Sequence, residues 1–182
     1  LVGDVNPSGQ TVDTFAKSLD DYPSTYNFHE SRDYVDYTDD IYVGYRYFET
    51  IPGAAEKVVY PFGYGLSYTT FDVETVSAGV VNSNCTSEAN KLYAKVRVTN
   101  TGKFSGKEVV QVYIAKPQGK LGKPAKELVA FEKTRELQPG ESQLMILTWE
   151  INDMASYDDL GKVKKSAYVL AAGSYDICLL YT

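Results

Sequence analysis

The strongest constraint on the fold is a period of two in the apolar residues that begins after Phe71. In the run 92–98, Leu, Ala and Val side chains occupy every second position, with Tyr, Lys and Arg between them, and the run 110–114 repeats this alternation. Similar short runs are found at 71–76, 128–137, 142–151 and 173–181. The turns between them include Asn100-Thr101-Gly102, where glycine tolerates positive φ, and Pro139-Gly140. The pattern predicts a mainly β fold, with about the seven short strands of an immunoglobulin-like or fibronectin type III-like sandwich.

Two of these runs are apolar on both faces. Leu144 and Ile146 alternate with Met145, Leu147 and Trp149, and the run 177–180 is apolar at every position. The outer face of an isolated sandwich is normally polar, which favours docking of this sheet on another domain. The alternative is a pair of central strands with scattered surface hydrophobes, which are common. Trp149 shares its face with Met145 and Leu147 and is therefore predicted to lie in the core.

Residues 1–70 have a different character. They are rich in Tyr, Asp, Gly and Pro and show no sustained period of 2 or 3.6 residues, which is typical of long structured loops. Such loops usually need a function or a neighbouring domain to hold them. The run 31–40 is expected to form a solvated acidic loop or short turn, and the run 41–50 fits a short strand or a helical turn equally well.

Composition excludes several classes of partner and site. A net charge of −6 argues against a nucleic-acid surface, and the longest apolar run is too short to span a membrane. Cys85 and Cys178 are too few for a disulfide framework and are expected to be ordinary thiols. A single histidine gives no metal-ligand spacing, so no metal or cofactor is predicted. The sequence Asn84-Cys85-Thr86 fits a glycosylation pattern too short to carry weight.

The carboxylates do not form a recognisable catalytic pair. Asp33, Asp36, Asp39 and Asp40 lie in one polar tract, and Asp158 and Asp159 precede Gly161 in a predicted loop. A hydrolytic site built on carboxylates generally needs two carboxyl groups with opposed roles, and nothing assigns such roles here. Both groups are therefore expected to be solvated acidic loops, and His29 is expected to be a surface or packing residue. No catalytic residue is predicted.

Three motifs, in this order along the chain, carry a family resemblance: VNPSG at 5–9, YPFGYGLSYTTF at 60–71 and GKLGKPAKEL at 119–128. Together they resemble the β-glucosidases and β-xylosidases of glycoside hydrolase family 3. The resemblance implies that residues 1–70 are the last part of an α/β sandwich domain and that residues 71–182 are a fibronectin type III-like domain. It also implies that the partners are a β/α barrel, the rest of the α/β sandwich, and a β-linked gluco- or xylo-oligosaccharide substrate of the parent enzyme.

The same resemblance locates the catalytic groups outside this chain. In the family the nucleophile is an Asp of the barrel, and the acid/base is commonly a Glu upstream of the Asn-Pro-Ser-Gly segment. The chain is therefore expected to be a fragment that is inactive alone and braces the catalytic domains; the lack of an initial Met agrees with this. The sequence VDTF at 12–15 departs from the usual run and resembles the branch whose domains are permuted. An autonomous carbohydrate-binding or cell-surface fibronectin-like module is the alternative.

Four residues are candidate substrate contacts. Tyr45 and Arg46 lie in the family-like run 41–48, where aromatic rings and a guanidinium suit a sugar's apolar face and hydroxyls; the alternative is that they tie a long loop to its domain. Lys120 and Lys123 lie in a basic loop that, in some members of the family, borders the active-site entrance; the alternative is a plain exposed loop. The run 60–71 itself is predicted to be an interdomain clasp, with glycines that permit a tight path.

Overall fold

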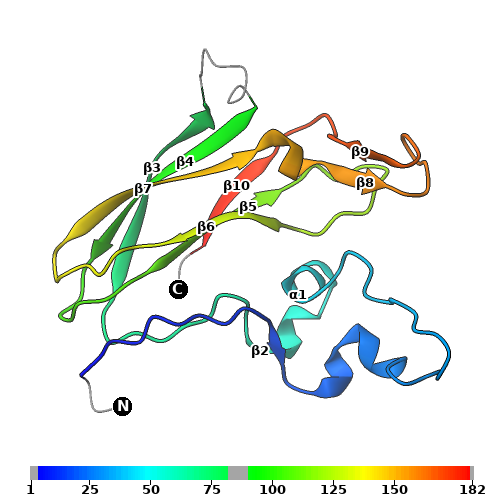
Figure 1. The fold of residues 1–182 in the computed structure, drawn as a ribbon, viewed down its shortest axis with the longest axis horizontal. Helices are drawn as coiled ribbons and strands as arrows, with labels where there is room; N and C mark the ends of the chain where they lie inside the picture. Colours follow the sequence, from blue (N-terminus) through cyan, green and yellow to red (C-terminus); the bar gives the residue numbers. More distant parts are fainter. Residues whose placement is uncertain (1–3, 82–89, 181–182) are drawn as a thin grey trace.

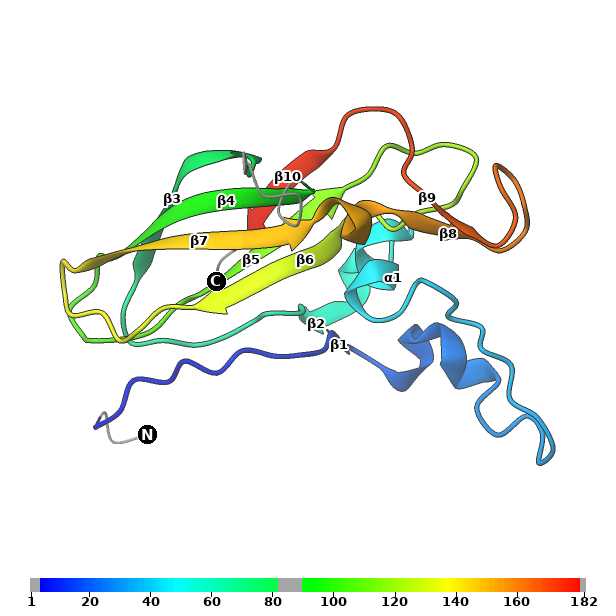
Figure 2. The same cartoon turned by 45° about the horizontal axis from the view of Figure 1, so that its top comes forward.

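The computed structural model describes residues 4–81 and 90–180, and shows a β-sandwich with the N-terminal third of the chain packed beneath it (Figure 1). Figure 2 shows the same arrangement after rotation, with the N-terminal third below the sheet that contains β5 and β6. Asn84, Cys85 and Thr86 lie outside the described residues, and Cys178 is a free thiol. No helix in the described ranges is long and apolar enough to cross a membrane.

The sandwich consists of two three-stranded antiparallel sheets, with strand orders β3-β4-β7 and β10-β5-β6. β6, within the predicted run 128–137 apart from its first residue, lies at the edge of its sheet. A two-stranded hairpin, β8-β9, extends beyond the sheets. The strands are β3 (Phe71–Val80), β4 (Lys91–Asn100), β5 (Val109–Ala115), β6 (Glu127–Lys133), β7 (Ser142–Glu150), β8 (Ser156–Asp158), β9 (Ala167–Val169) and β10 (Asp176–Leu180), with a 3-10 turn η4 (Ile151–Met154) after β7.

The core lies between the two sheets and is formed by the residues that the alternation predicted. Val96 and Val98 of β4 face Val112 and Ile114 of β5, and none of these side chains is accessible to solvent. Trp149 is only 4% exposed, which confirms the prediction that it is a core residue rather than a binding platform. Close packing of β-branched side chains from facing sheets is the usual basis of a sandwich core.

Within the described residues, the strand covered on both faces is β5; the docking predicted for the two apolar runs concerns another domain and stays a prediction. Leu144 and Ile146 of β7 are 48% and 57% exposed on the outer side of their sheet. Gln111 and Tyr113 of β5, by contrast, are buried on the outer side of the other sheet, where the N-terminal third covers them. A polar and an aromatic residue at alternate positions look like a solvent face in the sequence, so the pattern could not show this contact.

The N-terminal third contains few regular elements, as expected for structured loops. Its elements are β1 (Phe15–Ala16), the 3-10 turns η1 (Leu19–Asp21), η2 (Pro23–Tyr26) and η3 (Ala55–Lys57), α1 (Tyr45–Thr50) and β2 (Val58–Tyr60), with β1 and β2 paired antiparallel. The ambiguous run 41–50 is therefore partly helical. Phe48 of α1 is buried between the rings of Tyr22 and Tyr47, at centroid distances of 5.5 and 5.2 Å, which holds this short helix in place.

Two expectations about turns are wrong. Gly102 does not need positive φ; it is needed because a Cβ there would lie 2.1 Å from Thr69 Oγ1 and 2.7 Å from the nitrogen of Thr70. Asp158 is not solvated. Its carboxylate is fully buried and accepts hydrogen bonds from the backbone nitrogens of residues 161–164 at 2.6–3.0 Å.

Candidate functional site

The main feature of the molecule is the junction between the N-terminal third and the sandwich, made by residues 5–12, residues 60–71 and the loop 100–108. Thr11 pairs with the run 60–71 in both directions: its nitrogen donates to Tyr64 O at 2.8 Å, and Gly63 N donates to its carbonyl at 2.9 Å. Its hydroxyl donates to Pro61 O at 2.7 Å. Residues 5–12 and the run 60–71, about fifty residues apart in sequence, thus form one ribbon.

Asn6 connects this ribbon to the sandwich. Its Oδ1 accepts a hydrogen bond from Tyr68 N at 2.9 Å, and its Nδ2 donates to Ser105 O at 2.9 Å in the β4-β5 loop. Gly106 makes room for this amide, because a Cβ there would lie 2.4 Å from Asn6 Nδ2. The asparagine of the VNPSG motif therefore serves as a link between three chain segments.

Asn100 organises the sandwich side of the junction. Its side chain is fully buried and makes four hydrogen bonds: Oδ1 accepts from Thr69 Oγ1 at 2.7 Å and Gly102 N at 3.0 Å, and Nδ2 donates to Phe104 O at 2.7 Å and Leu137 O at 2.8 Å. A buried amide with all its capacity used fixes the loop geometry around it.

The glycines of the run 60–71 allow this run to lie close to a side chain of β5 and to the backbone of the VNPSG motif. Gly63 has a φ of 81° and is buried against Gln111 of β5, so that a Cβ there would lie 2.5 Å from Gln111 Nε2. At Gly65 a Cβ would lie 2.9 Å from Gly9 O. These contacts are those of a clasp between the N-terminal third and the sandwich.

A second contact is made by α1 on β5 and β6. Tyr45 Oη accepts a hydrogen bond from Leu128 N at 2.9 Å, and its ring packs against Tyr113 and Phe62 at centroid distances of 5.7 and 5.0 Å. Thr50 at the end of α1 accepts from Ala125 N at 2.8 Å. The helix is therefore tied to the basic loop and to β6 by main-chain donors.

An ion pair between Lys126 and Glu49 lies at this contact. Lys126 Nζ lies 3.0 Å from Glu49 Oε2 and 4.8 Å from the ring centroid of Tyr113. Tyr113 donates its hydroxyl proton to Gln111 Oε1 at 2.5 Å. Burial, with the nearby Tyr45 and Glu49, raises the pKa of Tyr113 well above its usual range. The site holds this phenol neutral, as a hydrogen-bond donor.

The four predicted site residues lie in two places: Tyr45 and Arg46 in α1, and Lys120 and Lys123 in the loop between β5 and β6. Tyr45 is committed to Leu128, and the Arg46 guanidinium carbon lies 6.0 Å from the Tyr45 ring centroid. The buried Arg46 Nε has no hydrogen-bond partner in the described part of the chain. Lys120 is exposed, whereas Lys123 is only 4% exposed and donates to Pro117 O at 2.6 Å. Burial, followed by the charge of Lys116, lowers the pKa of Lys123.

Lys123 is therefore not part of a plain exposed loop. Its ammonium group turns back onto the chain and holds the loop in shape. The loop also reaches the segment before α1, because a Cβ on Gly122 would lie 3.2 Å from Tyr42 Oη. The structure thus brings the basic loop beside the run that contains Tyr45 and Arg46.

Sequence reasoning missed Asn6, Gln111, Tyr113 and Asn100 as junction residues. The only signal was indirect: Asn6 lies within the VNPSG motif, Asn100 begins a predicted turn, and Gln111 and Tyr113 alternate with apolar residues in one strand. No group of three or more His, Cys, Asp or Glu side chains in residues 4–81 and 90–180 is placed to hold a metal ion. In the tract of four aspartates, only Asp39 is partly buried.

These features define a class: a fibronectin type III-like sandwich clasped by a loop-rich segment that precedes it. Residues 108–179 match the family model described as fibronectin type III-like domain. The chain is 60% identical to β-glucosidase A of Butyrivibrio fibrisolvens over 98% of its own length and 22% of that enzyme. Nearly the whole chain is thus similar to one part of the β-glucosidases of glycoside hydrolase family 3.

Solved structures show the same similarity. A β-glucosidase from Paenibacillus barengoltzii matches with a TM-score of 0.89 and 51% identity, over 97% of this chain and 19% of that one. A family 3 β-glucosidase from Bifidobacterium adolescentis matches with a TM-score of 0.81 and 30% identity, over 98% of this chain and 26% of that one. The chain spans about a fifth to a quarter of the length of these relatives.

Proposed function

We propose that the chain is the non-catalytic part of a β-glucosidase-like hydrolase and that it braces the catalytic domains. One observation carries the proposal: nearly the whole chain aligns with only 22% of a β-glucosidase at 60% identity. We assign residues 1–70 to the end of an α/β sandwich domain and residues 71–182 to the fibronectin type III-like domain. The β/α barrel and the rest of the α/β sandwich are its proposed partners, and β-linked gluco- or xylo-oligosaccharides are the proposed substrates of the whole enzyme.

The surface of the N-terminal third supports a bracing role. One side clasps β5, while the ribbon of β1, β2 and the following run exposes a series of apolar side chains. These are Val12 (87% exposed), Phe15 (51%), Val59 (48%), Tyr60 (45%) and Leu66 (68%). An apolar surface of this kind is typical of an interface with another domain. We propose that the rest of the α/β sandwich covers it.

A contribution to the substrate entrance is the finer part of the proposal. Tyr45, Arg46, Lys120 and Lys123 are the candidates. Arg46 has an unpartnered Nε that is buried in this chain, and Lys120 offers an exposed ammonium group that suits sugar hydroxyls. Lys123 donates to Pro117 O and so supports the loop that carries Lys120. It can contact a substrate only if this hydrogen bond opens.

Two assays test the proposal. The purified chain is expected to leave an aryl β-glucoside intact, whereas the longer enzyme that contains it is expected to hydrolyse it. The second assay titrates the chain with cello- and xylo-oligosaccharides at millimolar concentration. No measurable binding supports the bracing role. Measurable affinity supports the alternative, an autonomous carbohydrate-binding module. Hydrolysis by the chain alone contradicts the proposal.

A further inference from the structure

The β8-β9 hairpin is a rigid projection that the bracing role does not require. The buried Asp158 carboxylate accepts four backbone hydrogen bonds, and Ser166 N donates to Asp158 O at 2.7 Å. Burial opposes ionisation of this carboxyl, but the four amide donors outweigh it and hold the pKa of Asp158 below its usual value. A buried anion thus fixes the shape of the loop 159–166.

The fixed loop presents an apolar surface with a basic rim. Tyr157 and Tyr168 pack edge to face at 5.2 Å and are 51% and 77% exposed. Leu160 and Val163 beside them are 70% and 54% exposed. The exposed lysines 162, 164 and 165 surround this group. Aliphatic and aromatic side chains with a charged rim are the composition of a protein interface rather than of a sugar platform.

A surface of opposite charge and similar apolarity lies on the same chain, in the loop 28–43. Glu30, Asp33, Asp36 and Asp40 are exposed there. Phe28 (74% exposed), Tyr34 (58%), Val35 (71%) and Tyr37 (92%) lie among them. The loop also surrounds a hollow of about 410 Å³, lined by Phe28, Val35 and Tyr37 among others. Such a hollow suits an exposed aromatic anchor like Tyr168.

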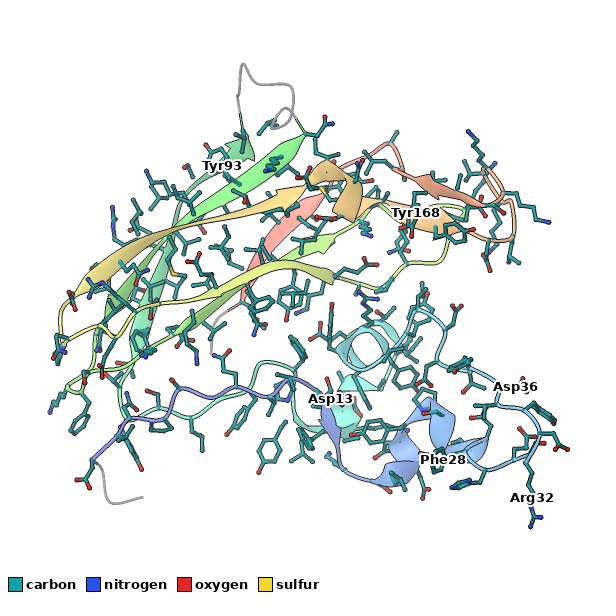
Figure 3. All side chains as sticks on the ribbon, in the orientation of Figure 1. Asp13, Phe28, Arg32, Asp36, Tyr93 and Tyr168 are labelled. Carbon is teal, nitrogen blue, oxygen red and sulfur yellow. The ribbon has the colours of Figure 1, made fainter. Side chains whose placement is uncertain are left out.

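The two surfaces lie at the same end of the molecule in Figures 1 and 2. Figure 3 places Tyr168 on the hairpin, and Phe28, Arg32 and Asp36 on the loop at that end. In a two-fold dimer, patch and counter-patch must both face the partner, because each contact occurs twice. Surfaces at one end of the chain meet this condition.

We propose that a second copy of this chain is the partner of the hairpin, with the hairpin of each copy seated on the acidic loop of the other. The lysines pair with the carboxylates, and Tyr168 enters the hollow. Charge complementarity gives the contact its register, and the apolar groups give it its buried area. This inference is independent of the bracing role, which concerns the β1-β2 side of the N-terminal third.

Sedimentation velocity of the chain, over a wide range of concentrations and at low and high salt, tests the proposal. A reversible dimer that weakens with salt is expected. K162E/K164E is expected to weaken dimerisation by about a hundredfold, since like charges across an interface cost several kcal/mol. D33K/D36K is expected to do the same. K103E/K107E, which makes the same charge change on the β4-β5 loop, is the matched control and is expected to dimerise like the parent chain.

The decisive arm mixes the two charge-reversed variants. Neither is expected to self-associate, but together they restore both contacts and form a heterodimer. Tyr168→Ala, with charges intact, is expected to weaken the dimer as well. Circular dichroism of each variant confirms the native fold. A chain that stays monomeric at every concentration, a mixture that fails to associate, or binding of an acidic polysaccharide without self-association overturns the proposal.

Discussion

Tyr45 Oη in α1 lies 2.9 Å from Leu128 N in β6, which donates its hydrogen to the phenol. The hydrogen bond joins the N-terminal third to the sandwich at a position where β6 has a register shift opposite β5. Tyr45→Phe keeps the ring contacts and leaves the Leu128 N–H without its acceptor. We expect a loss of about 1–2 kcal/mol in the free energy of unfolding, measured by urea denaturation. Tyr37→Phe, at a position 92% exposed, is the control and is expected to leave the free energy of unfolding of the monomer unchanged.

Gly102 tests the role of close approach at the junction. Gly102→Ala is expected to destabilise the chain by about 2 kcal/mol or more, because the new Cβ meets Thr69 Oγ1 and the backbone of Thr70. Gly119→Ala is the matched control, since a Cβ there has nothing within 4 Å and neither glycine has positive φ. Equal denaturation midpoints for the two variants would contradict the steric account.

Asn100 tests the buried amide. Asn100→Asp replaces the donor Nδ2 with an oxygen that faces the carbonyl oxygens of Phe104 and Leu137. The repulsion and the buried charge are expected to cost about 3 kcal/mol or more and to lower the thermal midpoint sharply. Asn152→Asp, the same change at an exposed position, is expected to have little effect. Similar thermal midpoints for the two variants would show that the amide network is unimportant.

The Asp158 carboxylate gives a prediction about pH. Its pKa is lower in the folded chain than the usual value of about 4. Its ionised form therefore stabilises the fold at pH values above this usual value. This stability is lost as pH falls through the folded-state pKa. Asp158→Asn is therefore expected to be less stable than the parent chain at neutral pH, with the difference narrowing in acid. Asp159→Asn is the exposed control, and a difference that stays constant with pH would contradict the assignment.

The sequence was sufficient for the sandwich and for the existence of the clasp. Alternation at 92–98 and 110–114 predicted the facing core positions of β4 and β5 because burial on one face imposes a period of two. The run 60–71 predicted a clasp because its glycines had no use in regular structure, and Gly63 and Gly65 both lie against another segment. Whether the outer face of β7 docks on another domain stays a prediction.

The remaining features depend on contacts that produce no periodic pattern in the sequence. The β8-β9 hairpin is held by one carboxylate bonded to backbone nitrogens, and in the sequence Asp158 is simply an acidic loop residue. Lys123 is buried because a carbonyl of its own loop accepts its ammonium hydrogen. The outer face of β5 is covered although Gln111 looks solvent-facing, because the cover comes from a distant segment. Local pattern reasoning cannot find side chain to main chain bonds of this kind.

Sequencing of the coding DNA on both sides of this segment tests the central claim most directly. The account predicts, in the same reading frame, a β/α barrel that carries an Asp nucleophile. A barrel encoded downstream supports the permuted domain order that the run 12–15 suggested, and a barrel encoded upstream gives the ordinary order. A reading frame with no barrel on either side would contradict the proposal that this chain braces a family 3 β-glucosidase.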